Sequence, residues 1–151
     1  MVGRRCGNLI FAVCVLCTLS SHLHPSQLQP EVILEVELDA FSGRPNPRWE
    51  LTGTQAAEFL ARLHALQPTR ANQFESEGLG YRGFVVRTTA EAANDFDEVR
   101  LYRGTVFMRH RDRVEAYSDP QRTLERWLLD SARGHVTQSV LAYIQSELER
   151  Q

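Results

Sequence analysis

In the stretch VILEVELD, residues 32–39, one face carries only apolar side chains, and the other carries Ile33, Glu35, Glu37 and Asp39. A period of two is typical of a strand that buries one face. After a short loop, residues 48–51 alternate in the same way, which predicts a second strand that returns beside the first. Short turns separate the later strand patterns and favour an antiparallel meander. These patterns lie at residues 80–88, 98–102, 105–109 and 113–117.

The hydrophobic period changes to 3.6 in TQAAEFLARLHAL, residues 54–66, which predicts an amphipathic helix. A second helix is predicted near the end of the chain, with Asp119 as its cap, Pro120 in its first turn and Gly134 after its last. A third follows from about His135. The sequence therefore predicts an α+β fold, in which an antiparallel sheet of five or six strands packs against one internal helix and two C-terminal helices.

The apolar faces of these elements define the expected core. Its centre is expected at Leu34, Val36, Leu38, Phe59, Leu60, Leu63, Val85, Leu101, Phe107, Trp127, Leu128, Leu141 and Ile144.

The first 21 residues have the features of an export signal, because Arg4 and Arg5 precede an apolar run and small residues follow it. The run is shorter than the roughly 20 residues that a membrane span needs, so no stable membrane insertion is expected after signal cleavage. We expect a signal peptide over residues 1–21, a linker over 22–30 and a single domain over 31–151. The expected location is secreted or periplasmic.

Composition removes several kinds of chemistry from the mature domain. All three cysteines lie in the predicted signal, which excludes disulfides, thiolate metal sites and a cysteine nucleophile. The chain contains no lysine, so Schiff-base catalysis is excluded. Without the signal, 15 arginines stand against 19 acidic residues, a formal charge of −4. We therefore expect no nucleic-acid partner that binds through overall basic charge.

The segment FSGRPNPRWEL, residues 41–51, follows the first strand. Pro45 and Pro47 fix two φ angles, and Gly43 permits a conformation that other residues resist, so the loop is expected to be stiff. A stiff loop with arginines suits an anion, a sugar or a loop of a partner protein. A plain strand connection with Trp49 in the core is the alternative. The residues predicted to bind a ligand are Ser42, Arg44, Asn46 and Arg48.

The stretch from Glu37 to Trp49, an acidic strand followed by FSGRPNP, resembles a group of small exported proteins of unknown function that share an FSGRPNP-like loop. The resemblance covers about a dozen residues. It implies that the loop is characteristic of that group, and it implies no activity.

Two pairs of side chains are candidates for acid–base chemistry. His110 and Asp112 lie together in the basic segment RHRDR, and Glu35 and Glu37 share one face of the first strand. A solvated hairpin tip and the wet face of a sheet are the corresponding structural interpretations. No serine elbow, HExxH, calcium loop or nucleotide motif is present, so no metal and no cofactor are expected.

The sequence thus favours a non-catalytic binding or interaction module that uses the loop of residues 41–48. The expected partner is a protein or a small anionic or sugar ligand. The alternative is a small secreted hydrolase or lyase that uses carboxylate or histidine acid–base chemistry.

Overall fold

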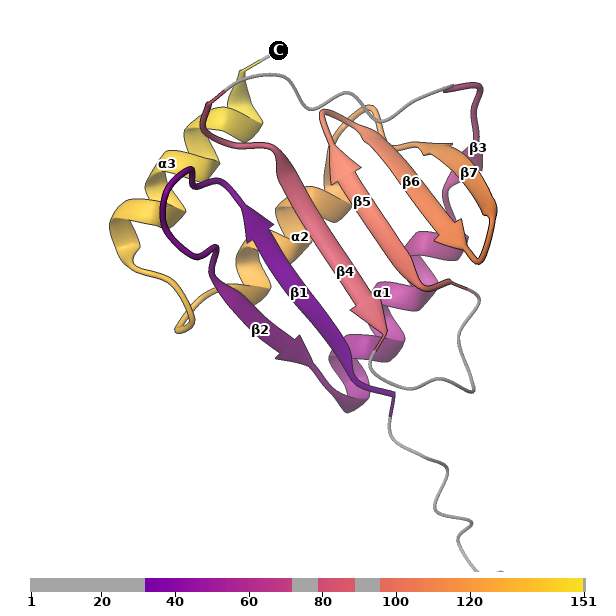
Figure 1. The fold of residues 1–151 in the computed structure, drawn as a ribbon, viewed down its shortest axis with the longest axis horizontal. Helices are drawn as coiled ribbons and strands as arrows, with labels where there is room; N and C mark the ends of the chain where they lie inside the picture. Colours follow the sequence, from indigo (N-terminus) through magenta and orange to yellow (C-terminus); the bar gives the residue numbers. More distant parts are fainter. Residues whose placement is uncertain (1–31, 72–78, 89–95, 151) are drawn as a thin grey trace, which may run out of the picture.

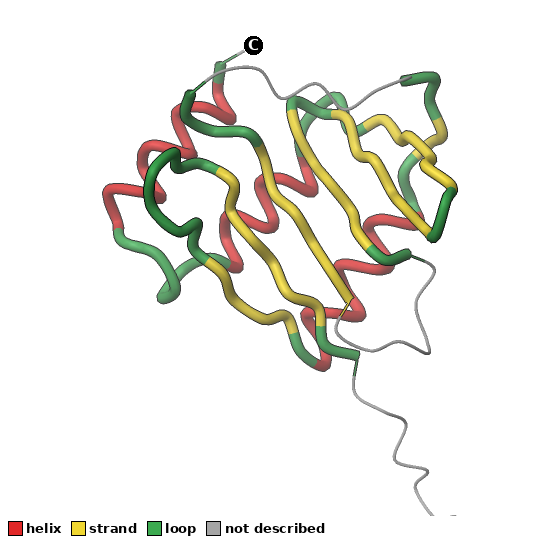
Figure 2. The backbone as a smooth tube through the Cα atoms, viewed as in Figure 1, coloured by secondary structure: helices red, strands yellow, loops and turns green. Residues whose placement is uncertain are grey.

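The computed structural model describes residues 32–71, 79–88 and 96–150. The predicted signal peptide and linker, residues 1–30, lie outside the described residues. Two helices cross one face of a single antiparallel sheet, and the third packs beside them (Figures 1 and 2). The α+β class predicted from the sequence is confirmed.

The sheet has seven strands in the order β2-β1-β4-β5-β6-β7-β3, and every neighbouring pair is antiparallel. The strands β4 to β7 follow one another as the predicted meander, while β1 and β2 extend it at one edge (Figure 1). The strands are β1 (Leu34–Asp39), β2 (Arg48–Leu51), β3 (Gln67–Pro68), β4 (Gly83–Thr88), β5 (Glu98–Tyr102), β6 (Thr105–His110) and β7 (Arg113–Ser118).

Alternation along β1 separates the two faces of the sheet. Leu34, Val36 and Leu38 are fully buried and face the helices, while the acidic residues between them are half-buried on the opposite face. The core continues through the inner faces of the central strands and the apolar stripes of the helices. Its largest fully buried side chains include Phe59, Phe84, Phe96 and Leu128.

The helices are α1 (Gly53–His64), α2 (Thr123–Ser131) and α3 (Gln138–Glu149). α1 buries Ala56, Phe59 and Leu63, which recur at helical spacing. None of the helices within the described residues is long and apolar enough to cross a membrane.

Several details differ from the sequence prediction. The sheet has seven strands, not five or six, because the two-residue strand β3 lies where the sequence shows no strand pattern. A strand of two residues is too short to show an alternating pattern. Leu60 and Trp127, predicted at the core centre, are only partly buried against it. Val85 and Phe107 are buried but lie outside the main core cluster.

The second helix begins later than predicted. Asp119 does cap it, but from four residues before its start: the carboxylate accepts the backbone N–H groups of Thr123 at 3.0 Å and Leu124 at 2.8 Å. Arg122 between them has a left-handed backbone, with φ +55°, which stops the helix from extending toward Pro120. The third helix begins at Gln138 because the residue before it is extended.

Candidate functional site

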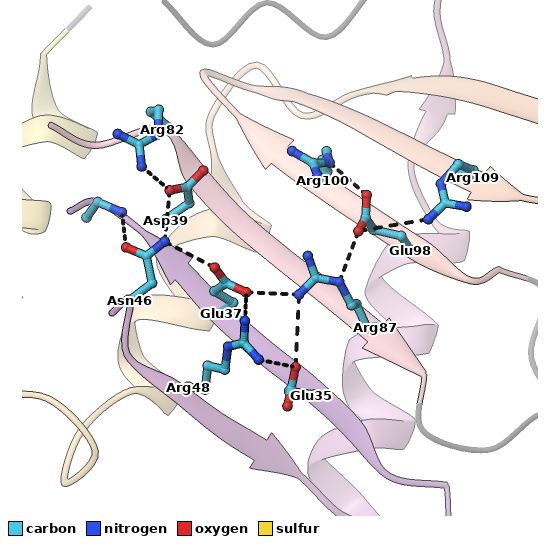
Figure 3. Close-up of polar contacts among 11 residues, drawn as sticks. Glu35, Glu37, Asp39, Asn46, Arg48, Arg82, Arg87, Glu98, Arg100 and Arg109 are labelled. Carbon is cyan, nitrogen blue, oxygen red and sulfur yellow. Dashed lines mark hydrogen bonds and ion pairs between the residues drawn. The ribbon is translucent and has the colours of Figure 1, made fainter. Parts of the chain in front are cut away.

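The loop between β1 and β2 is organised around the side chain of Asn46. Its Oδ1 accepts the backbone N–H groups of Ala40 at 3.2 Å and Phe41 at 3.0 Å. Its Nδ2 donates to Glu37 at 3.1 Å and to Asp39 at 3.0 Å (Figure 3). The amide therefore uses two donors and two acceptor positions, its full capacity. Asn46 thereby holds the turn between Pro45 and Pro47.

Arg82, just before β4, fastens the same loop from the neighbouring strand. Its guanidinium donates to the Asp39 carboxylate, to the Phe41 carbonyl at 3.2 Å and to the Ser42 hydroxyl at 3.3 Å. The backbone adds a bond from Leu38 N to the Pro47 carbonyl at 3.0 Å. The loop is thus fixed at both ends and at its centre.

A groove with a volume of about 470 Å³ lies between this loop and the start of α3. The Arg44 guanidinium stacks on the ring of Phe41, 3.6 Å from its centre. The loop wall is formed by Phe41, Arg44, Pro45 and Pro47. The opposite wall is formed by His135, Val136, Thr137, Ser139 and Val140.

The second wall of the groove is positioned by Trp49. Its ring stacks with the His135 ring at 6.2 Å and an interplanar angle of 19°. Its Nε1 donates to the Ser131 hydroxyl at 3.1 Å, which ties β2 to the end of α2. Trp49 is itself 4% exposed and belongs to the core, as the alternative interpretation of the loop expected. The same residue therefore fixes both the loop exit and the segment that leads into α3.

The four predicted binding residues have different surroundings. Arg44 lines the groove, while Ser42 and Asn46 hold the loop in shape. Arg48 is not a groove residue: it lies on the sheet face away from the helices and pairs with Glu37 at 2.9 Å and Glu35 at 3.6 Å (Figure 3). Of the four predicted residues, Arg44 is thus the one at the groove, while Ser42 and Asn46 support the loop that carries it.

That outer face of the sheet carries a chain of ion pairs that runs from β2 to β6 across five strands (Figure 3). Arg87 on β4 bridges Glu37 on β1 at 2.9 Å and Glu98 on β5 at 3.0 Å. Glu98 also contacts Arg100 at 2.7 Å and Arg109 at 3.9 Å. Opposite charges placed on adjacent strands stabilise the register of an uncovered face.

These contacts keep the carboxylates ionised. Partial burial alone would raise the pKa of Glu37, but the hydrogen bond from Asn46 and the contacts with Arg87 and Arg48 outweigh it and hold the pKa below its usual value. Burial is likewise outweighed at Glu98, whose pKa is lowered by Arg100, Arg87 and Arg109. A carboxylate with a lowered pKa is a poor proton donor near neutral pH.

The candidate catalytic residues do not converge. Glu35 and Glu37 share one face of β1, as predicted, but both lie in ion pairs with Arg48 and Arg87. His110 ends β6, with β4 and β5 between it and β1. The Nδ1 atom of His110 has no hydrogen-bond partner among the described residues, and Asp112 is exposed at the turn that follows.

Sequence reasoning missed a buried carboxylate on α2. Glu125 is 1% exposed and accepts the Tyr81 hydroxyl at 2.5 Å and the Gly104 backbone N–H at 2.9 Å. Burial, followed by the charge and hydrogen bond of Glu125, raises the pKa of Tyr81 well above its usual value. The available signal was its helical phase, because Glu125 is three and four residues before the buried Leu128 and Leu129.

Within the described residues, no three His, Cys, Asp or Glu side chains gather as metal ligands. Comparison with protein-family models, curated proteins and solved structures finds no match to this chain.

Proposed function

We propose that this chain is an exported, non-catalytic binding protein that uses the groove beside the loop of residues 41–47. The observation that carries the proposal is the groove itself, in which a charged guanidinium lies beside apolar walls. Arg44 and His135 offer polar contacts, while Phe41, Pro45 and Val140 offer apolar ones. This combination suits an acidic group attached to an apolar body.

Preorganisation of the loop supports this proposal. Asn46 makes four hydrogen bonds and Arg82 fastens the loop to β4, so the ligand does not need to order this wall. Ordering mobile side chains and loops on binding costs affinity, at roughly 0.5–1.5 kcal/mol per immobilised side chain. A wall that is already fixed avoids much of that cost.

A segment of a partner protein fits the groove better than a small molecule does. Arg44, Thr137 and Ser139 at the groove are exposed, so a small ligand would stay largely in contact with water. Small-molecule sites typically bury about 70–90% or more of the ligand surface. We therefore propose that the ligand of the groove is an extended protein segment with an acidic side chain beside an apolar one. A small anion or a sugar is the competing ligand.

The hydrolase or lyase alternative has less support. Glu37 and Glu98 have lowered pKa values, which opposes a role as general acid. His110 and Asp112 lie away from the groove, among residues that form a strand end and a turn.

Panning a displayed random-peptide library against the purified domain tests the binding site. Selected peptides should carry Asp or Glu beside an aromatic residue, proline or valine. Their Kd should rise at least tenfold for Arg44→Ala, which removes the charge, and for Ser139→Tyr, which fills the groove from the exposed first turn of α3. Arg48→Ala is the matched control and should bind like the wild type. Selected peptides that bind all four proteins equally would refute the groove as the site, and enrichment of none would refute recognition of a peptide segment.

The proposal that the protein is exported rests on the pattern in residues 1–21, and a separate experiment tests it. The intact mass of the protein collected outside the cytoplasm should correspond to a chain that lacks Cys6, Cys14 and Cys17. A mass that retains them would contradict the predicted cleavage, whatever the groove binds.

A further inference from the structure

A second cavity, of about 290 Å³, lies at the opposite end of α3 from the groove. Four separate parts of the chain meet there: the entry to β4, the β5–β6 turn, the start of α2 and the end of α3. The lining residues are Tyr81, Tyr102, Arg103, Arg122, Glu147 and Arg150.

The charges in this cavity are not balanced. Arg150 pairs with Glu147 at 2.6 Å, and Arg122 donates to the backbone carbonyl of Glu147 at 2.9 Å. Arg103 lies over the Tyr102 ring, 5.0 Å from its centre. Within the described part of the chain, neither Arg103 nor Arg122 forms an ion pair with a carboxylate. Even when the buried Glu125 behind Tyr81 is counted, three arginines face two carboxylates.

The backbone at the two arginines without a carboxylate partner is left-handed. Arg103 has a φ of +49° and Arg122 a φ of +55°. This conformation costs an ordinary L-residue roughly 1–2 kcal/mol, and glycine or asparagine adopts it more easily. Arg111, with a φ of +53°, shows the same feature at a hairpin tip that does not line the cavity. A left-handed backbone alone is therefore no evidence for a binding site. The evidence is that the side chains of Arg103 and Arg122 line the same cavity.

We propose that this cavity binds a small organic oxyanion, a carboxylate or a phosphate ester, through the guanidinium groups of Arg103 and Arg122. Guanidinium groups match the geometry of carboxylates and phosphates and form charge-assisted hydrogen bonds with them. The site shares no residue with the groove, so it is a function beyond the proposed one.

The size and the walls of the cavity indicate an organic body on the anion. A bare oxyanion occupies only a few times the roughly 30 Å³ that one water takes up in the liquid, and this leaves much of the cavity unfilled. Tyr81 and Tyr102 provide aromatic wall atoms for the remainder. The phenol of Tyr81 is neutral near pH 7 and donates its proton to a hydrogen bond with Glu125, so Tyr81 itself adds no negative charge to the cavity.

Thermal unfolding with inorganic phosphate and with phenyl phosphate tests the proposal, against sodium chloride at the same ionic strength. The test variants are Arg103→Asn and Arg122→Asn, since asparagine accepts the left-handed backbone. The matched control is Arg111→Asn, which removes an arginine from the same conformation elsewhere. Phenyl phosphate should raise Tm for the wild type and for the control, and its Kd should be at least tenfold weaker for both test variants. The Gly104 amide resonance, beside Arg103, should shift with the same Kd.

An equal Tm response in all four proteins would show a general salt effect and overturn the site, as would the absence of any response. The Arg103 side chain lies over the Tyr102 ring and makes no hydrogen bond or ion pair within the described residues, so Arg103→Asn keeps the test decisive if Arg122→Asn destabilises α3. Equal affinity for the two anions would refute the organic body. Each result is independent of peptide binding at the groove.

Discussion

Replacing the Asn46 amide by a carboxylate should strongly destabilise the domain. Asn46→Asp is nearly isosteric and keeps an oxygen that can accept from Ala40 N and Phe41 N. It loses the Nδ2 donor to Glu37 and Asp39, at 3.1 and 3.0 Å, and places a third negative charge between them. The substitution therefore inverts one half of the hydrogen-bond network while preserving the shape of the side chain.

The magnitude follows from these two contacts. Hydrogen bonds to charged groups contribute about 1.5–3 kcal/mol each, and the lower end applies here because Asn46 is only half-buried. The two lost bonds then account for about 3 kcal/mol, and repulsion among three carboxylates adds about 1–2 kcal/mol at a dielectric close to that of bulk water. We expect the free energy of unfolding to fall by about 4–5 kcal/mol at pH 7, a large part of the roughly 5–15 kcal/mol typical of a domain.

The destabilisation should depend on pH in a defined direction. The neighbouring carboxylates raise the folded-state pKa of the new carboxyl at position 46 above its unfolded value of about 3.9. Below that value both states carry the proton, and the protonated group can again donate one hydrogen bond. The penalty relative to the wild type should therefore be smallest at and below about pH 4, grow between that pH and the folded-state pKa, and stay constant above it.

Urea unfolding followed by tryptophan fluorescence measures this, because Trp49 lies directly after the loop. Gln67→Glu is the matched control: it makes the same change in charge at an exposed side chain and should lie within about 0.5 kcal/mol of the wild type. A difference below 1 kcal/mol for Asn46→Asp, or a penalty that does not shrink at low pH, would refute the role assigned to the amide.

Three further predictions concern other contacts. Because the pKa values of Glu37 and Glu98 are lowered from 4.5, their stabilisation is present above that pH, and the free energy of unfolding should decrease as the pH falls below it; a flat profile would contradict the ion-pair network. Because the pKa of Tyr81 is raised above 10, the free energy of unfolding should decrease as the pH rises past 10. Tyr81→Phe should remove that part of the decrease, and denaturant unfolding at pH 7 should show a free energy of unfolding lower by about 1–3 kcal/mol. Gly104→Ala should destabilise more than Gly43→Ala in the same assay: both have positive φ, but only at Gly104 would a Cβ meet a backbone oxygen, at 2.7 Å; equal losses would show that this contact relaxes freely.

The strands were predictable wherever one face is buried. Period two is visible in β1 and in the meander because the helices cover only one side of the sheet. The helix α1 was equally visible from its apolar stripe. The two-residue β3 was not predictable, because its position depends on pairing with Ser118 and Tyr117, about 50 residues later.

The candidate site was only partly predictable. The prolines of the loop predicted that it is rigid, and the four hydrogen bonds of Asn46 hold it in shape. Arg48 was predicted to bind a ligand together with Arg44, but alternation with the buried Trp49 turns it to the outer face, away from the groove. Arg82 and the wall formed by α3 come from residues about 40 and 90 positions later than the loop, which a local pattern does not reveal.

The buried Glu125 carboxylate helps to fix the shape of the cavity that Arg103 and Arg122 line. A buried carboxylate is costly, and two hydrogen bonds offset that cost only if both donors stay in place. The donors are Tyr81, which lines the cavity, and Gly104, whose neighbour Arg103 lines it as well. Glu125 also lies three residues after Arg122 on the chain. Because Glu125 must keep both hydrogen bonds, it fixes the positions of Tyr81, the turn at Arg103 and the start of α2 relative to one another. Arg103 and Arg122 are thereby held at the same cavity despite their mutual repulsion.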